Sequence, residues 1–536
     1  MSAFKRAPWA WLALMLAGGL QSASLAWPSS TGTWIERGQA MGWLQLVSMA
    51  AAVVVITRSR STWDAALKTG VFATTWLCAS FAWLYVSMHQ YGGLPAWAAA
   101  AAVLLLAMAL SLYYAAAGAV FWRWRGEHPV WAACLFAATW TMAELARGQW
   151  LTGFPWGAIG YAHVDQWGEW LRWLGVYGVG AMAAALAAAG ALGLTQQRYT
   201  TTAAALALAL GLAAWAPGAD NTQSTGGLRA WLLQGNIQQD QKFNNDTGIR
   251  QALTWYPSQW AASLQASTKP DLVVAPETAI PVLPQHIDSG WWRAWLAPLA
   301  AQTPDSEGRV VHWMTGIPLG DANMGYTNSA WGLDPKSAQT EKPWEATSGY
   351  RYDKHHLVPM GEFIPPLFRW FTEWMNIPLG DFNRGAVVQT PWRVNGQQVA
   401  AHICFEDVFG EEMAQTVANT DASVLVNLSN LAWFGGTIAL EQHLNIARVR
   451  AMELGRPIVR ATNTGATAHI DHLGRVVARM PTQVRGHLAV EVDGRSGQTP
   501  YVRWVSAFGL WPVWVLSMAV VAWAVWRRRS WVKPGP

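Results

Sequence analysis

Long runs of apolar residues occupy the first and last parts of the chain. About 20 such residues, wound as a helix, cross the hydrocarbon core of a bilayer. A soluble protein would need an implausibly large core to bury so many long, uniformly apolar helices, so the pattern predicts eight transmembrane helices. They are expected at residues 7–27, 41–57, 70–88, 94–122, 129–147, 173–194, 200–217 and 505–526.

The pattern changes between residues 218 and 504, where short β-rich segments alternate with helical stretches and loops. Residues 248–265 and 438–454 are predicted helices, and the length of the region suits one α/β domain with a large core. We therefore expect a seven-helix membrane domain at 1–217, an α/β domain at 218–504, and a last transmembrane helix with a basic tail at 505–536. Segments typical of strands are 228–236, 271–278, 310–318, 398–406, 422–430, 456–465, 466–474 and 487–494.

Composition supports a membrane location. Hydrophobic residues make up 52% of the chain, charged residues only 13%, and 38 residues are tryptophan. This balance is typical of membrane proteins when the apolar residues are clustered. The net charge of +5 does not indicate nucleic-acid binding, because the basic residues lie at the edges of the apolar runs and form no patch or motif. The three cysteines do not make a disulfide framework.

Basic residues occupy every second loop between the predicted spans, whereas an alternate loop such as 89–93 has none. Because positively charged loops stay in the cytoplasm, we expect both termini there and the α/β domain in the periplasm of a bacterium. The first span is expected to remain, since its removal as a signal peptide would break the alternation. The basic residues that set this orientation are Lys5, Arg6, Arg58, Arg60, Lys68, Arg123, Arg125, Arg198, Arg527, Arg528, Arg529 and Lys533.

Chemically capable side chains stand at three predicted strand ends of the α/β domain: Glu277, then Lys354 with Glu362, then Cys404. A thiol is mostly protonated at neutral pH and needs a base or a nearby cation to act as a nucleophile. Partial burial can raise the pKa of a glutamate towards neutrality, so Glu277 could take the proton. Lys354 and the backbone N–H of Phe405 could hold the oxyanion of a tetrahedral intermediate. The set therefore suits acyl transfer.

Each of these side chains also has a purely structural interpretation. A buried cysteine is usually a small hydrophobic residue, a glutamate at a strand end can cap the next helix, and a loop lysine is usually solvated. A zinc site at Cys404 with His355, His356 and His402 is disfavoured, because no CxxC or HxxxH pair is present. The glycines of residues 175–182 lie in a predicted span and indicate close helix contacts, not a dinucleotide site.

The order of several motifs resembles the nitrilase superfamily with its Glu–Lys–Cys triad. The motifs are PET at 276–278, KHHLVPMGE at 354–362, CFE at 404–406 and SNLAWFG at 429–435. The predicted spans, together with TGFPWGAIGYA at 152–162 and the segment 441–465, are similar to the apolipoprotein N-acyltransferase family. This resemblance extends over essentially the whole chain.

The resemblance implies a multi-pass helical membrane domain joined to a four-layer αββα sandwich. It also implies a nucleophile, a general base and an oxyanion stabiliser, which are Cys404, Glu277 and Lys354 respectively. The supporting residues that it implies are Glu362, which positions the lysine and the thiol, and Phe405 and Glu406 directly after the cysteine.

Aromatic side chains are expected to contact the substrate. Phe243 stands where the family usually has a tryptophan, so the ring remains but the indole N–H is missing. Met360 stands where the family commonly has a phenylalanine, and the side-chain volume is kept.

The segment 362–382 is either a buried core helix or a membrane-facing arm that admits lipid. Its large apolar residues include Phe368 and Met375. The expected substrate-binding residues are Phe243, Trp370, Phe371, Trp374 and Trp433.

The resemblance implies an inner-membrane N-acyltransferase. It takes a fatty acyl chain from a glycerophospholipid as a cysteine thioester and passes it to the α-amino group of the diacylglyceryl-cysteine of an apolipoprotein. No cofactor, metal or nucleic acid is expected, and the chain is expected to act as a monomer. A membrane-tethered amidase or nitrilase that uses water would need the same triad and stays the alternative. A non-catalytic membrane scaffold is disfavoured by the intact set of Glu277, Lys354, Glu362 and Cys404.

Overall fold

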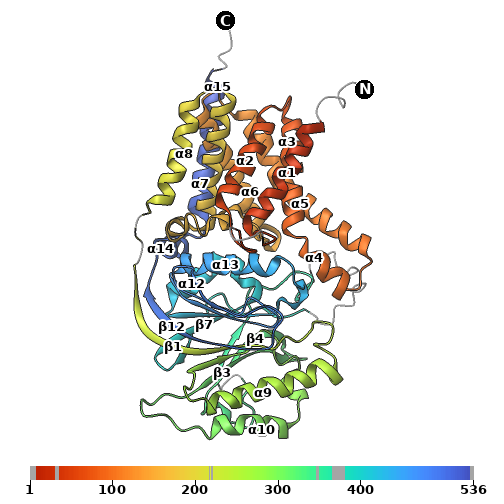
Figure 1. Cartoon of the computed structure of the whole chain (residues 1–536), viewed down its shortest axis with the longest axis vertical. Coiled ribbons are helices and arrows are strands. Elements are labelled where there is room, and N and C mark those ends of the chain that lie inside the picture. Colours follow the sequence, from red (N-terminus) through yellow and green to blue (C-terminus); the bar gives the residue numbers. More distant parts are fainter. Residues whose placement is uncertain are drawn as a thin grey trace. The chain divides into compact units, whose positions relative to one another are not determined.

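The computed structural model describes residues 8–531 except 31–34, 217, 219–220, 346–348 and 365–380. The chain divides into two compact units. The helical unit comprises Met1–Tyr85, Pro95–Ala219 and Ala507–Pro536, and the α/β unit comprises Val86–Leu94 and Asp220–Ser506. In Figure 1 the helical unit holds the red-to-yellow helices and α15, and the α/β unit holds the sheets.

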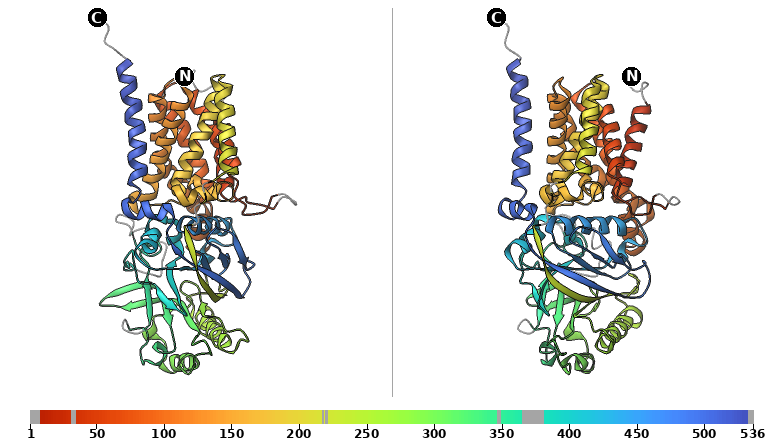
Figure 2. Two further views of the ribbon diagram at one scale, coloured as in Figure 1. Left: turned by 90° about the vertical axis from the view of Figure 1, so that its left-hand side faces the viewer. Right: turned by 60° about the vertical axis from the view of Figure 1, so that its left-hand side comes forward.

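The apolar runs form the helices of the helical unit, which are visible as a bundle in Figure 2. Leucines such as Leu105, Leu112 and Leu210 are exposed on the helix surfaces, as expected for helices that face lipid. The helices are α1 (Pro8–Leu25), α2 (Gly42–Thr57), α3 (Thr62–Ser80), α4 (Trp83–Val86), α5 (Ala96–Trp124), α6 (Pro129–Gln149), α7 (Gly168–Thr195), α8 (Tyr199–Ala214) and α15 (Trp511–Trp531).

Fewer helices than predicted meet the length and composition needed to cross a membrane. In the described part of the chain, α5 and α7 meet both conditions, and up to four spans are present if each of two bent helix pairs counts as one. Helices α2 and α8 have 16 residues each, which is about 24 Å at 1.5 Å per residue and shorter than a hydrocarbon core of about 30 Å. The prediction of eight transmembrane helices is therefore not confirmed.

Two six-stranded sheets form the centre of the α/β unit. All eight segments predicted as strands contain one, whereas β4, β5, β6 and β11 were not expected from the pattern. The first sheet has the order β12 (Gly486–Gly497), β1 (Thr222–Gln234), β2 (Leu272–Val274), β3 (His312–Asp321), β4 (Gly325–Leu333) and β5 (Tyr350–Asp353). The second has the order β11 (Val476–Arg479), β10 (Ala468–Ile470), β9 (Ile458–Thr462), β8 (Val424–Ser429), β7 (Gln397–Ile403) and β6 (Trp392–Val394).

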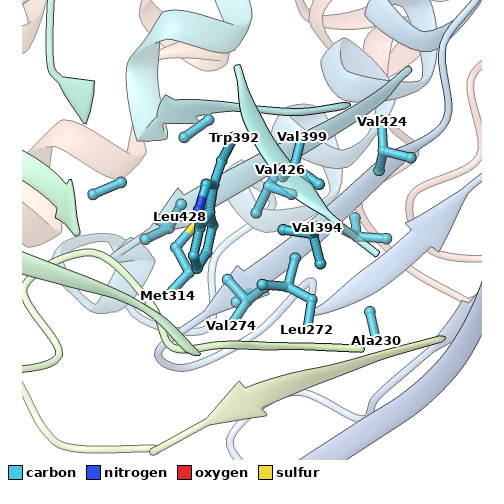
Figure 3. Packing of buried hydrophobic residues seen from close by; sticks show 14 of the residues in the cluster. Ala230, Leu272, Val274, Met314, Trp392, Val394, Val399, Val424, Val426 and Leu428 are labelled. Atoms are coloured by element: carbon cyan, nitrogen blue, oxygen red, sulfur yellow. The ribbon is translucent and has the colours of Figure 1, made fainter. Parts of the chain in front are cut away.

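The core between the sheets follows from the alternation of side chains along each strand. Leu272 and Val274 of β2 enter this core with Val426 of β8 (Figure 3). Val273 faces the other way, into a tryptophan-rich layer with α9 (Arg250–Gln265) and α10 (Ser289–Ala300). Helices α12 (Gly410–Asn419) and α13 (Ala439–Leu454) lie along the second sheet (Figure 1). These layers form the αββα sandwich that the resemblance implies.

Candidate active site

Glu277 lies in the loop that follows β2 and is held against β3. A Cβ atom added to Gly316 of β3 would lie 2.5 Å from the Cα of Glu277, so only glycine allows this approach. The backbone N–H of Gly316 donates to the carbonyl of Pro276 at 3.2 Å. The next residue, Thr278, has a positive φ of 51°. Because the neighbouring backbone fixes this turn, the carboxylate of Glu277 has a defined direction.

Lys354 follows β5 directly and lies between two carboxylates. Its Nζ atom is 3.2 Å from Glu277 Oε1 and 2.9 Å from Glu362 Oε1. The side-chain amide of Asn328, in β4, donates to the same two oxygens at 2.8 Å and 2.6 Å. The backbone N–H of Val358 donates to the second oxygen of Glu362 at 2.8 Å. All three charged groups are therefore held by several hydrogen bonds each.

Cys404 follows β7 directly and begins a 3-10 helix, Cys404–Val408. Its φ of 53° lies in the left-handed region, which costs a non-glycine residue roughly 1–3 kcal/mol and is found disproportionately at active sites. The residue is partly exposed. The backbone of Asn430, directly after β8, hydrogen-bonds the Cys404 thiol and donates to Glu277 Oε2 at 2.9 Å. This one amide therefore links the cysteine to the carboxylate.

The pKa of Glu277 is lowered in the site, whereas the sequence suggested that burial would raise it. Burial alone would raise the pKa of Glu277, but the Lys354 ammonium, the Asn328 amide and Lys242 outweigh it and hold the pKa below its usual value. The prediction of a raised pKa is therefore wrong, because it did not include these neighbours. Burial lowers the pKa of Lys354, but Glu277 and Glu362 raise it above its usual value.

The Cys404 thiol is neutral in the resting site. Burial and the Glu277 charge raise its pKa, and the Lys354 charge opposes them only in part. The resting site therefore contains a carboxylate, an ammonium and a protonated thiol. A thiolate would form only as the proton moves to Glu277 during attack.

Glu406 ties the Lys354 loop to the Cys404 turn. Its buried carboxylate accepts hydrogen bonds from the backbone N–H groups of His355 at 2.8 Å and Ile403 at 2.6 Å, and from the Tyr352 hydroxyl at 2.9 Å. Phe405 is also buried, and its ring is packed on Phe409 with centroids 5.3 Å apart. Both residues lie where they can fix the geometry of the turn.

The expected substrate-binding residues are only partly described. Phe243 and Trp433 are both half-buried. The Trp433 ring meets Tyr91 edge-on, with centroids 6.0 Å apart, and its backbone carbonyl accepts a hydrogen bond of 2.8 Å from Ser87 Oγ. The remaining expected residues, Trp370, Phe371 and Trp374, lie outside the described residues, as do residues 365–380 of the proposed arm.

Several polar residues of the site were not predicted from the sequence. Asn328 lies inside a strand, where a single asparagine gives no signal, and Asn430 was noted only as part of a motif. Lys242 is buried, and its Nζ atom donates to the carbonyl of Glu277 at 3.1 Å. Among the described residues, no group of three or more His, Cys, Asp or Glu side chains is placed to hold a metal ion.

Two family models match the chain. The Apolipoprotein N-acyltransferase N-terminal domain matches residues 17–189, and Carbon-nitrogen hydrolase matches residues 232–501. A carbon-nitrogen hydrolase structure from Helicobacter pylori G27 is 16% identical, with a TM-score of 0.34, and the match covers 54% of this chain and 94% of that one.

Curated relatives match over nearly the full length. The apolipoprotein N-acyltransferase of Verminephrobacter eiseniae is 47% identical, covering 97% of this chain and 96% of that protein. The apolipoprotein N-acyltransferase of Ralstonia nicotianae is 43% identical, covering 86% of this chain and 85% of that protein. With both family models and both relatives in agreement, the chain belongs to the apolipoprotein N-acyltransferase family and is an acyltransferase with a carbon-nitrogen hydrolase domain.

Proposed function

We propose that the chain moves a fatty acyl group from a membrane phospholipid to the N-terminal α-amino group of diacylglyceryl-cysteine apolipoproteins, through a thioester on Cys404. The observation that carries this proposal is the ion-paired contact of Lys354 with Glu277 beside the Cys404 thiol. An acyl-transfer site needs a nucleophile, a base and a cation for the oxyanion, and these three side chains supply one each.

In the first half-reaction, Cys404 Sγ attacks the ester carbonyl of the phospholipid while Glu277 accepts the thiol proton. The oxyanion of the tetrahedral intermediate is stabilised by the Lys354 ammonium and the backbone N–H of Phe405. When the C–O bond breaks, Glu277 returns the proton to the leaving alkoxide. The products are a lysophospholipid and an acyl thioester on Cys404. Glu362 and Glu406 act as positioning residues, since each holds a reacting element in place through hydrogen bonds.

In the second half-reaction, the α-amino group of the acceptor attacks the thioester carbonyl. Glu277 accepts a proton from the attacking nitrogen, and the same cation and N–H hold the oxyanion. The C–S bond then breaks, and the proton passes from Glu277 to the sulfur. An amide forms and the neutral thiol is restored, so the cycle is of the ping-pong type.

We further propose a monomer in the inner membrane, with both termini cytoplasmic and the α/β unit periplasmic. The alternation of basic and uncharged loops supports this orientation. The first apolar helix is retained in this arrangement, and Phe243 and Trp433 contact the lipid substrate.

The match of residues 232–501 to carbon-nitrogen hydrolases supports one other candidate, an amidase that releases the acyl group to water. Both candidates share the thioester step, so the acyl donor and the final acceptor distinguish them.

Intact-mass measurement of the purified protein after incubation with phospholipid tests the proposal. We expect one fatty acyl mass that maps to Cys404 and disappears when a diacylated lipopeptide is added. Cys404→Ala is expected to enter the membrane and to form no adduct, whereas Cys134→Ala, a matched control in α6, forms it normally. No adduct from phospholipid, together with turnover of small amides, would support the amidase instead.

A further inference from the structure

Lys242 is a second cation close to the reacting groups, and the proposed mechanism does not use it. Only 3% of its surface is exposed. Its ammonium donates a 3.1 Å hydrogen bond to the backbone carbonyl of Glu277. It also interacts electrostatically with the Glu277 carboxylate and with the Cys404 thiol. The group therefore lies beside both the base and the nucleophile.

The ammonium of Lys242 has more donor capacity than the described part of the chain satisfies. A lysine ammonium carries three N–H donors, and among the described residues Lys242 makes one hydrogen bond, to the Glu277 carbonyl at 3.1 Å. The nearby carboxylates already have other partners: Glu277 accepts from Lys354, Asn328 and the backbone of Asn430. Among the described residues, two N–H groups of Lys242 therefore have no acceptor and can bind a ligand.

The loop that carries Lys242 is fixed in place. The backbone of Asn236 donates to the carbonyl of Asn463 at 2.7 Å, and that of Ile237 donates to the side chain of Asn463 at 3.0 Å. Gln239 accepts a 2.8 Å hydrogen bond from the side chain of Asn430. Lys242 is therefore a preorganised group of the site and not a mobile surface lysine.

Burial of this cation without a bonded anion is unfavourable. Burial lowers the pKa of Lys242 to about 8, although the Glu277 carboxylate opposes the shift. Buried charges are normally paired, because an isolated ion loses its hydration without compensation. A fixed ammonium that lacks an ion pair among the described residues, and lies beside the nucleophile, is arranged to receive an anionic group from a substrate.

We propose that Lys242 binds the phosphodiester of the phospholipid acyl donor and thereby places its ester carbonyl at Cys404. This inference rests on the proposed function and adds the group that recognises the donor. At the reacting ends of the two proposed substrates, only the phospholipid carries a permanent anionic oxygen. The acceptor presents an amine, which a neighbouring ammonium repels when it is protonated. Lys242 therefore acts in the first half-reaction and has no direct role in the second.

Comparing two acyl donors tests this role. The full-length enzyme in detergent is given a phospholipid or a diacylglycerol with the same acyl chains, and the rate of acyl-Cys404 formation is followed by intact mass. A hydrogen bond to a charged group contributes about 1.5–3 kcal/mol, so Lys242→Met should raise the half-saturating phospholipid concentration roughly ten- to hundredfold. Because Lys242→Met also removes a charge that lowers the pKa of Glu277, the diacylglycerol reaction and the release of the acyl group to a lipopeptide amine should change too, but by a much smaller factor than the phospholipid reaction. Lys242→Arg should restore much of the phospholipid reaction.

Two controls separate this role from structural effects. Lys269→Met removes an exposed lysine of the same unit and should leave both donors unaffected. In the wild-type enzyme, soluble glycerophosphoethanolamine should slow acylation by diacylglycerol, because it occupies the same cation without supplying an acyl group. This measurement needs no variant, so it still decides the proposal if Lys242→Met does not fold.

The role of Lys242 would be overturned if Lys242→Met slowed acyl-Cys404 formation equally with both donors, or if glycerophosphoethanolamine did not slow acylation by diacylglycerol. Either result would leave the thioester mechanism intact. Failure of the wild-type enzyme to form acyl-Cys404 from phospholipid would instead overturn the proposed function itself.

Discussion

The left-handed backbone of Cys404 makes a prediction about stability that is separate from its chemistry. An L-residue other than glycine is strained at a φ of 53°, whereas glycine adopts this region freely. Although Cys404→Ala and Cys404→Gly should both lose acyl-enzyme formation, the glycine variant should be the more stable by about 1 kcal/mol. Urea unfolding of the two variants in the same detergent measures the difference. An alanine variant of equal or greater stability would show that the turn stores no strain.

The carboxylate of Glu277 has opposite effects on the thiol at rest and during catalysis. It raises the pKa of Cys404 in the resting site, yet it is the base that the proposed mechanism requires. Glu277→Gln removes the negative charge while Lys354 remains, so the thiol pKa should fall. At pH 8 we therefore expect iodoacetamide to alkylate Cys404 roughly tenfold faster in the variant, with acyl transfer from phospholipid abolished.

Measuring the alkylation rate from pH 6 to pH 10 checks the sign of this shift. The rise of the rate with pH should begin at lower pH in Glu277→Gln than in the wild type. Glu307→Gln, which changes an exposed carboxylate of the same unit, should have the same profile as the wild type. A rise that begins at higher pH in Glu277→Gln would contradict the proposed charges of the resting site.

The sequence predicts which side chains meet better than it predicts their charge. Glu277 and Cys404 could be singled out because each stands where an apolar β-rich segment stops, one after a strand of the first sheet and one after a strand of the second. Lys354 follows β5, which the pattern does not predict, and is identified by the motif KHHLVPMGE. Asn328 could not be found, since its two hydrogen bonds to carboxylates depend on strand pairing that no local pattern encodes. The pKa of Glu277 depends on the same unseen contacts, which explains the wrong sign of the prediction.

The 3-10 helix that begins at Cys404 is held in place by a row of buried polar side chains. His402 of β7, Asn427 of β8 and Arg460 of β9 lie side by side in register across three parallel strands. Asp407, in the 3-10 helix, is 2.6 Å from both His402 Nε2 and Arg460 Nη1. The ring of His443, in α13, lies 3.2 Å from the second oxygen of Asp407 and hydrogen-bonds the backbone of Cys404. The row therefore connects three strands and a helix to the nucleophile turn.

Asp407→Asn tests the contribution of this row to stability. It leaves Arg460 buried without its charge partner, which costs about 3–5 kcal/mol in comparable sites. Burial alone would raise the pKa of Asp407, but Arg460 and His402 hold it well below its usual value. A depressed carboxyl pKa stabilises the fold at neutral pH, and this contribution is lost as the pH falls through the acid range.

Unfolding of the wild type and the variant, followed from pH 7 to pH 3, measures both effects. The variant should be less stable at pH 7, and the difference should shrink as the pH falls. Asp421→Asn, at an exposed position before β8, should behave like the wild type. A difference that stays constant with pH would mean that Asp407 acts through packing and not through its charge.

Element prediction was strongest where one periodicity continued over many residues. The predicted helices at 248–265 and 438–454 correspond to α9 with its preceding turn and to α13. Strands β4 and β5 were missed, because polar and aromatic residues interrupt the alternation at 325–333 and 350–353. Loop-borne groups such as Lys242 had no periodic signal at all.

At the scale of the whole molecule, the α/β unit is discontinuous in sequence. Residues Val86–Leu94, between two apolar runs of the helical unit, belong to the α/β unit, and Ser87 and Tyr91 contact Trp433 there. Apolar runs alone could not reveal this, since the segment is short and lies between predicted spans. Its membership has a topological consequence: residues 86–94 and 220–506 must lie on the same side of the membrane.

Labelling of single cysteines tests that consequence together with the proposed orientation. In a background with Cys78, Cys134 and Cys404 replaced by alanine, a cysteine is placed at exposed Gln90, at exposed Asp305 or at exposed Glu127. A membrane-impermeant maleimide added to intact spheroplasts should label the first two to the same extent, because both belong to the α/β unit, which we propose to be periplasmic. Glu127→Cys follows a basic loop and should react only after the membrane is opened. Labelling of Gln90→Cys without Asp305→Cys would contradict the single α/β unit, whereas labelling of Glu127→Cys alone would keep that unit and reverse its orientation.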